Sequence, residues 1–266
     1  MKALFFPFFS VLLIWFLEWV FIGRKIQENF LSKEKTFYTE LILWLSHYTP
    51  VASILSSVSC FGIFNLIKFL LRKYPFDLFQ NVGLNYKIVI YLTVVDFSGY
   101  LAHFILHKVE GFWNFHQFHH SAQEFNVLTV NRVHFFEKSF IKLTQTSTLI
   151  LLGGGIEVFW WWYMFSTFLG HLKHSNFRFN YPGILKYIIQ SPAHHWIHHS
   201  DNPNHYDTNY GEILQIWDTI FGTGLNPKQK EILEINIGTN YTKNYADNFL
   251  HLFFSPYKKI FKKNIE

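Results

Sequence analysis

The chain has 266 residues, of which 50% are hydrophobic and 21% aromatic, yet its mean hydropathy is only +0.10. Strongly apolar segments must therefore alternate with polar ones, as in a membrane protein with a sizeable part outside the bilayer. The net charge of +5 forms no regular basic stripe, which argues against nucleic-acid binding. The single cysteine, Cys60, excludes an intrachain disulfide and an iron–sulfur cluster, so a metal would have to bind to histidine or carboxylate.

The first three apolar runs predict membrane helices. Residues 3–22 and 51–71 are each long enough to span a bilayer, and Pro50 is expected to end a separate helix before the second of them. The third run, from residue 84 to about 106, ends in a row of polar side chains spaced by steps of four, three and four, which places them on one helical face: Asp96, Tyr100, His103 and His107. No polar linker divides the chain, which predicts a single domain over residues 1–266.

The fourth apolar run, residues 140–169, has Gly153, Gly154 and Gly155 at its middle. A triple glycine breaks a helix, and each arm would extend only about 21 Å against a hydrocarbon core of about 30 Å. We therefore expect a helical hairpin that enters and leaves on one side. The basic loop at residues 24–35 predicts that this side is the cytoplasm, by the positive-inside rule.

Histidines are the main chemical signal, because twelve of the fifteen lie between His103 and His199. Ten of them fall into four clusters with steps of three or four residues, so that members on one helix point the same way. Neutral imidazole suits zinc, copper, iron and nickel, and ten donors would serve two metals with about five each. The four clusters are His103/His107, His116/His119/His120, His171/His174 and His195/His198/His199.

Several other chemistries are excluded by inspection. The sequence has no His-Glu-x-x-His motif of zinc proteases and no Gly-x-Ser-x-Gly elbow, and the triple glycine lacks the Lys-Ser/Thr of a phosphate loop. A non-catalytic metal protein, such as a zinc transporter, remains the alternative to an enzyme. Transporters place their ligands near the bilayer midplane, whereas most of these histidines lie in polar stretches, which favours the enzyme.

The histidine clusters resemble the three histidine boxes of the fatty acid hydroxylase/sterol desaturase superfamily of membrane non-haem di-iron oxygenases. The resemblance covers about residues 84–224 and extends beyond histidine. Further matching segments are Asp96 and Tyr100 before the first box, Trp113 and Ser121 around the second, Arg132-Val-His134 with Glu137, Asp207-Thr-Asn209-Tyr210-Gly211, and Trp217-Asp218 to Thr223.

This resemblance implies an all-α membrane bundle with a histidine-rich cytosolic helical cap, two iron ions, and O₂ as co-substrate. It implies that eight box histidines are iron ligands, and by analogy that His171 and His174 complete a set of ten. It further implies a lipid substrate and an external electron donor, a ferredoxin or a cytochrome b5-type protein with its reductase. Supporting residues around the ligands would be Asp96, Tyr100, Arg132, His134, Glu137 and Asp207.

The sequence leaves several points open. Hydroxylation and desaturation need the same ligands, and the lipid could be a sterol, a fatty acyl chain, a sphingoid base, an ether lipid or a carotenoid. His134 and His194 could ligate metal, but a supporting role suits His134 better. Three histidines outside the clusters are expected to be dispensable: His47, His205 and His251.

Overall fold

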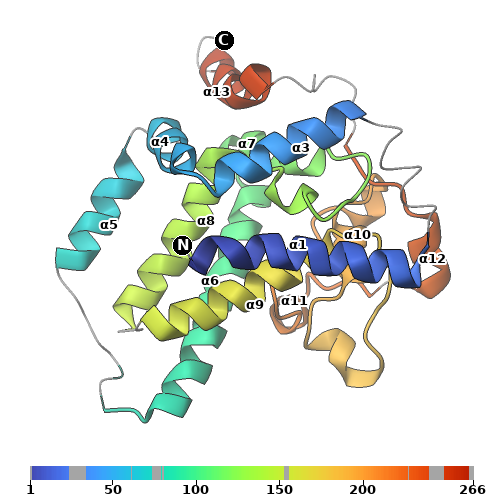
Figure 1. Ribbon diagram of the computed structural model, residues 1–266, viewed down its shortest axis with the longest axis horizontal. Helices are drawn as coiled ribbons and strands as arrows, with labels where there is room; N and C mark the ends of the chain where they lie inside the picture. Colours follow the sequence, from blue (N-terminus) through green and yellow to red (C-terminus); the bar gives the residue numbers. More distant parts are fainter. Residues whose placement is uncertain are drawn as a thin grey trace.

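The computed structural model describes residues 2–23, 34–60, 62–73, 79, 81–152, 156–226, 228–239 and 249–263. Most of these residues are helical, and the described part contains two isolated β-bridges but no extended strand. The all-α prediction is confirmed for this part of the chain (Figure 1). The α-helices are α1 (Lys2–Phe21), α3 (Glu34–His47), α4 (Pro50–Ser59), α5 (Ile63–Lys73), α6 (Leu84–Lys108), α7 (Glu110–His120), α8 (Phe135–Leu151), α9 (Ile156–Lys173), α10 (Pro192–His198), α11 (Ile216–Phe221), α12 (Gln229–Glu234) and α13 (Phe249–Lys263).

Residues 51–71, predicted as a membrane span, do not form one continuous helix. Pro50 does start a new helix, and α3 and α4 meet at an angle of 94°. However, α4 ends at Ser59, and Gly62 follows with a φ of +73° before α5 begins. A left-handed residue stops an α-helix, and glycine adopts that conformation without steric cost. The apolar run is therefore two short helices.

Helix α6 is the best candidate for a membrane span. Residues Asn85–Lys108 form the one helix, among the described residues, that is long and apolar enough to cross a bilayer. The bent pair of α3 and α4 would add a second if it counts as one broken span, and α1 contains a shorter apolar helix over Phe5–Phe21. The multi-pass arrangement stays a prediction.

The fourth apolar run forms two helices, α8 and α9, as expected from its central glycines. Helix α8 ends at Leu151 and α9 begins at Ile156, while Gly153–Gly155 lie outside the described residues. Helix α6 packs along α8, and α1 lies along α9 (Figure 1). A core cluster joins α6, α8 and α9, and the Tyr91 hydroxyl of α6 donates to the carbonyl of Leu152 over 2.6 Å.

The start of α8 and the end of α9 both lie beside histidines of α7. His116 Nδ1 lies 2.8 Å from Glu137 Oε1 near the start of α8, and His119 Nε2 lies 3.2 Å from His174 Nε2 just past the end of α9. The segments before and after the predicted hairpin therefore share one site, which is what a re-entrant pair would require.

This arrangement predicts that the segments before and after the hairpin face the same side of the membrane. Single cysteines at the exposed positions Gln123 and Asn202, in a Cys60→Ala background, should react with a membrane-impermeant maleimide from the same side in sealed vesicles. Labelling from opposite sides would mean that residues 140–169 cross the bilayer once, and the shared site could not form.

Candidate metal centre

The structure gathers nine of the ten predicted ligands into two compact groups. Within each group the candidate ligand nitrogens all lie within 4.8 Å of one another, and the side chains are buried, that of His107 with 6% of its surface exposed. The first group consists of His103, His107, His116, His120 and His198, and the second consists of His119, His174, His195 and His199.

Four elements supply these rings. Helix α6 provides His103 and His107, α7 provides three histidines, the end of α9 provides His174, and α10 with its C-cap residue provides the rest. The side chains of neighbouring residues on a helix diverge by about 100°. Each adjacent pair is therefore split between the groups, so that His119 and His199 join one group while His120 and His198 join the other.

Backbone carbonyls fix the protonation of two rings of the second group. His174 Nδ1 lies 2.8 Å from the carbonyl oxygen of Gly170, and His119 Nδ1 lies 3.3 Å from that of Arg132. A carbonyl can only accept, so each neutral ring carries its proton on Nδ1 and a lone pair on Nε2. These two Nε2 atoms face each other at 3.2 Å, and two lone pairs cannot form a hydrogen bond.

The first group follows the same rule. His103 Nδ1 donates to the Tyr210 carbonyl over 2.9 Å, and His198 Nδ1 donates to the Thr208 carbonyl over 2.7 Å, which leaves both Nε2 lone pairs directed at the other rings. His198 Nε2 has no hydrogen-bond partner among the described residues. Convergent lone pairs of this kind need a cation between them.

A proton is a poor candidate for that cation. Burial lowers the pKa of His174 to about 3, and burial followed by the nearby His174 lowers the pKa of His119 well below its ordinary value. Both nitrogens of His199 and Nδ1 of His195 are also buried without a hydrogen-bond partner in the described part of the chain. Two nitrogen-binding metal ions fit this donor set, one with five imidazoles and one with four.

Two of the six predicted supporting residues contact the rings through a carboxylate. Glu137 Oε1 lies 2.8 Å from His116 Nδ1, and Asp207 Oδ1 lies 3.6 Å from His107 Nδ1. A carboxylate on the second ring nitrogen orients an imidazole and makes it a better metal ligand. Asp207 also accepts from Lys108 over 2.7 Å and holds a φ of +61°.

Asp96 and Tyr100 act further from the rings than predicted. Asp96 accepts from the backbone amides of Ile213 and Leu214, at 3.0 and 3.2 Å, and from the Trp217 indole, while the Tyr100 hydroxyl lies 3.1 Å from Thr223 Oγ1. These contacts tie α6 to the segment that supplies the Thr208 and Tyr210 carbonyls.

Asp218 completes that anchor from within the segment. It accepts from the amides of Tyr210 and Gly211 at 2.8 and 2.7 Å, and so closes the turn at Gly211. A Cβ atom at Gly211 would lie 2.5 Å from the Leu214 carbonyl oxygen, so the turn needs glycine there.

Three other histidines lie outside both groups. His171 is buried in α9 with Nδ1 at 2.9 Å from Ser10 Oγ, and the structure does not bring it to the other rings. His134 caps α8, because its Nδ1 accepts from the Phe136 amide and its Nε2 donates to the Phe253 carbonyl. His194 forms a capping box with Ser191 and contacts Asn226 Oδ1 at 2.9 Å.

Arg132 contacts one candidate ligand through its backbone, because its carbonyl accepts from His119 Nδ1. Its guanidinium donates to Ser121 Oγ at 3.1 and 3.3 Å and lies over the Phe118 ring, with the ring centroid 4.6 Å away. The carbonyl acceptors could not be predicted from the sequence, because every residue has a carbonyl group and only the tertiary fold decides which of them faces a histidine ring.

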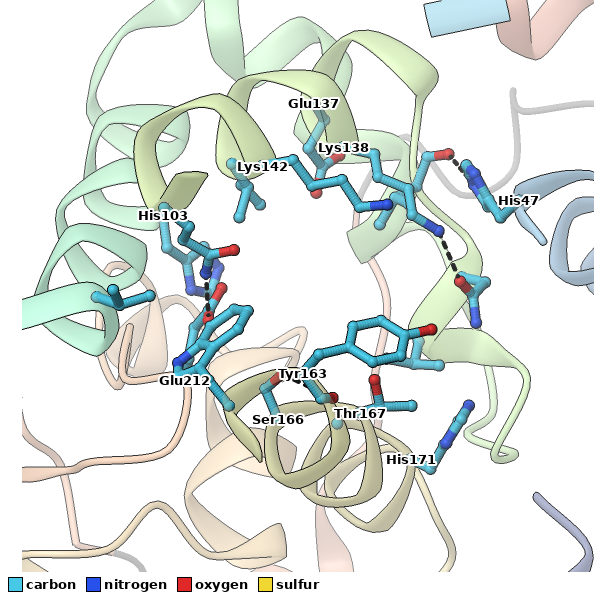
Figure 2. A pocket seen from close by; sticks show the side chains of 18 of the residues that line it. His47, His103, Glu137, Lys138, Lys142, Tyr163, Ser166, Thr167, His171 and Glu212 are labelled. Carbon is cyan, nitrogen blue, oxygen red and sulfur yellow. Dashed lines mark hydrogen bonds between the residues drawn. The ribbon is translucent and has the colours of Figure 1, made fainter. Parts of the chain in front are cut away.

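A cavity of about 540 Å³ adjoins both groups, between α3, α6, α8 and α9 (Figure 2). Five of the converged rings contribute to its lining: His103, His116, His119, His174 and His195. His47 also lines it, with Nε2 at 3.3 Å from the Val133 carbonyl, and its dispensability stays a prediction. His205 does lie elsewhere, against Ser200 and Glu231, and the side chain of His251 is outside the described part.

The sequence profile of the fatty acid hydroxylase family matches residues 88–223, which contain all nine converged histidines. The chain belongs to the fatty acid hydroxylase family. The match covers half of the chain and includes α6 to α11, so the resemblance seen in the histidine boxes is confirmed.

The curated proteins similar to this chain include enzymes named for reactions on lipids. The ornithine lipid hydroxylase OlsE of Rhizobium tropici is 33% identical over 180 residues, which is 68% of this chain and 53% of that protein. Alkylglycerol monooxygenase of Xenopus tropicalis is 34% identical over 51% of this chain and 30% of its own length, and the Homo sapiens enzyme is 30% identical over 60% and 35%. The chain thus spans about half or less of these relatives. No solved structure matches it significantly.

Deletion of one histidine from either group should remove the metal ion of that group alone. His120→Ala and His199→Ala each delete a donor from a different group, so the purified proteins should fall from about two metal ions per chain to about one. His205→Ala, outside both groups, should keep both ions. Metal analysis at equal membrane abundance checks this, and a His199→Ala protein with full metal content would remove the second group from the assignment.

Loss of the carboxylate on His116 should weaken the first group alone. Glu137→Gln keeps the size of the side chain and a hydrogen-bond acceptor but removes the charge, so metal affinity should fall by roughly 10- to 100-fold. Glu231→Gln is the matched control, because Glu231 also contacts a histidine, His205, at 3.2 Å. Equal metal affinity of the two variants in chelator competition would argue against a role for Glu137.

Proposed function

We propose that this chain is a membrane-bound, O₂-dependent di-iron oxygenase that hydroxylates or desaturates a C–H bond of a lipid. One observation carries the proposal: nine imidazoles, several with a proton fixed on Nδ1, converge in two adjacent groups beside a cavity. Iron bound in such a site would reduce O₂ and oxidise an unactivated C–H bond, which side-chain acid–base chemistry cannot do.

The cavity beside the two groups supports a catalytic site. A structural metal has a closed set of ligands, whereas a catalytic metal keeps a position for solvent or a co-substrate. His119, His174 and His195 would hold a metal at the wall of the cavity, because these three rings of the second group line it. A substrate in the cavity would therefore lie next to both groups.

The reaction needs reducing equivalents from outside the chain. Insertion of one oxygen atom consumes one O₂, two electrons and two protons and releases one water, while desaturation with the same inputs releases two waters. The sequence contains no flavin, haem or dinucleotide motif. We therefore propose a ferredoxin or a cytochrome b5-type protein, with its reductase, as the donor.

The chain's own residues would hold the ligands and exclude water. The Thr208 and Tyr210 carbonyls and the Glu137 carboxylate keep Nδ1 protons away from the metals, and Phe125 packs 4.8 Å from the His199 ring between centroids. Buried surroundings also strengthen electrostatic interactions at the site.

A lipid substrate and a membrane location are supported together. The named relatives are an ornithine lipid hydroxylase and alkylglycerol monooxygenases. Large apolar side chains of α1 remain exposed, including Phe5, Leu12 and Phe21, as expected for contact with acyl chains. We propose a multi-pass arrangement with the metal centre on the cytoplasmic side.

Metal content and turnover test the proposal together. Detergent-purified protein should bind about two metal ions per chain, and iron rather than zinc should support the reaction, because zinc has no redox chemistry. Lipid mass spectrometry of cells with and without the gene should reveal a species heavier by one oxygen or lighter by two hydrogens. Unchanged activity after iron removal would contradict the proposal, and full zinc loading with no lipid change in cells would favour a non-catalytic metal protein.

A further inference from the structure

His171 is the predicted ligand that stays outside both metal groups, yet it lines the cavity beside them. Its side chain is completely buried on α9, and Figure 2 shows it at the cavity wall on the same side as Thr167. Ring Nδ1 lies 2.9 Å from the hydroxyl oxygen of Ser10 on α1, while ring Nε2 has no hydrogen-bond partner among the described residues. A buried polar atom without a partner at a cavity wall is suited to a ligand atom.

The contact with Ser10 decides which nitrogen of His171 carries the proton. Burial, followed by the positive charge of Lys138, lowers the pKa of His171 to about 3, so the ring is neutral and has one N–H group. With that proton on Nδ1, both the buried Ser10 hydroxyl proton and the Nε2 lone pair would lack a partner in the described part of the chain. If the hydroxyl donates to Nδ1 instead, only the Nε2–H group lacks one. The second arrangement costs less, because each unpaired buried polar group is unfavourable.

The polarity of the cavity wall changes along α9. Trp162 lies at an apolar part of the wall and shares a core cluster with Val95 and Leu149, which also line the cavity. Further along the helix the lining side chains carry hydroxyl and imidazole groups: Ser166, Thr167, His171 and then the candidate ligand His174. An amphiphilic molecule along this wall would have its hydrocarbon chain beside Trp162 and its first polar atom beside His171.

We propose that His171 donates a hydrogen bond from Nε2 to the linkage oxygen of the lipid, the carbonyl or ether oxygen where the hydrocarbon chain joins the headgroup. The inference rests on the proposed function, because it names the substrate class of that same site. In this tautomer Nε2 can only donate, so the ligand atom must be an acceptor. An uncharged oxygen accepts from a neutral imidazole without the cost of burying a charge.

This assignment accounts for the separation of His171 from the metal ligands. His174 is three residues further on, about 4.5 Å along the helix axis, and its Nε2 faces the rings of His119 and His195. The contact with Ser10 holds the ring of His171 beside α1 instead. One histidine cluster would thus serve two purposes, with His174 holding a metal and His171 binding the lipid next to it.

Lipid binding by the metal-loaded protein in a non-ionic detergent tests the assignment without turnover. A monoacylglycerol, a monoalkylglycerol and an alkanediol of equal chain length carry the same hydroxyl groups and differ at the linkage, which is an ester, an ether or a methylene group. At least one oxygen-linked lipid should bind about tenfold more tightly than the alkanediol, and the tighter one identifies the acceptor as a carbonyl or an ether oxygen. His171→Phe should abolish this preference, because it keeps a ring but removes the donor.

Two further variants control for packing. His171→Gln should keep most of the preference, since glutamine also places an N–H donor at the end of its side chain. His205→Phe is the matched control and should keep all of it, because Nδ1 of this buried histidine also lies 2.9 Å from a serine hydroxyl, that of Ser200, but the ring lies away from the cavity. Metal content reports folding, and if His171→Phe loses metal, the smaller His171→Leu carries the test.

Equal binding of the three lipids by the unaltered protein would overturn the inference. A preference that survives in His171→Phe, or an equal weakening of all three lipids in that variant, would overturn it as well. Lipid oxidation in cells by a protein without linkage preference would contradict this inference alone. A His171-dependent linkage preference without any lipid oxidation would contradict the proposed function alone.

Discussion

The fold around the centre depends on one constraint: buried imidazoles that point lone pairs at one another must share a cation. His119 and His174 show it most directly, since each donates its Nδ1 proton to a carbonyl and their Nε2 atoms meet at 3.2 Å. Without a metal this contact is repulsive. With one, the same geometry becomes two metal–ligand bonds, so metal binding and formation of the native packing are thermodynamically linked.

The segment between α10 and α11 serves this constraint. It carries the carbonyls of Thr208 and Tyr210 to the rings of His198 and His103. Two buried carboxylates hold the segment, Asp218 from α11 and Asp96 from α6. Burial raises the pKa of Asp218, and its hydrogen bonds to Thr223, Tyr210 and Gly211 lower it again, so the carboxylate is satisfied by amides rather than by a metal. The two acids hold the backbone of this segment in place, and the imidazoles are the candidate metal ligands.

Helices α8 and α9 also place the cavity beside the converged histidines. Helices α8 and α9 leave the centre and return to it, and their facing surfaces combine apolar side chains with lysine and hydroxyl groups. An amphiphilic lining beside the converged histidines agrees with the lipid substrate that we propose. This agreement between lining and site comes from packing, because the lysines at 138 and 142 have no recognisable motif around them.

The sequence by itself determined the helical class, the break between α8 and α9, and nine histidines of the centre, since helical periodicity and ligand type are local properties of the chain. It could not decide that His171 contacts Ser10 while His174 joins the centre, because one residue lies in the last turn of α9 and the other just past its end, and the difference depends on which elements pack against each. It also placed one helix over residues 51–71, where the left-handed Gly62 produces two. Only the tertiary structure decided which five and which four rings converge and which carbonyls orient them, because those contacts join residues from different helices and no spacing along the chain encodes them.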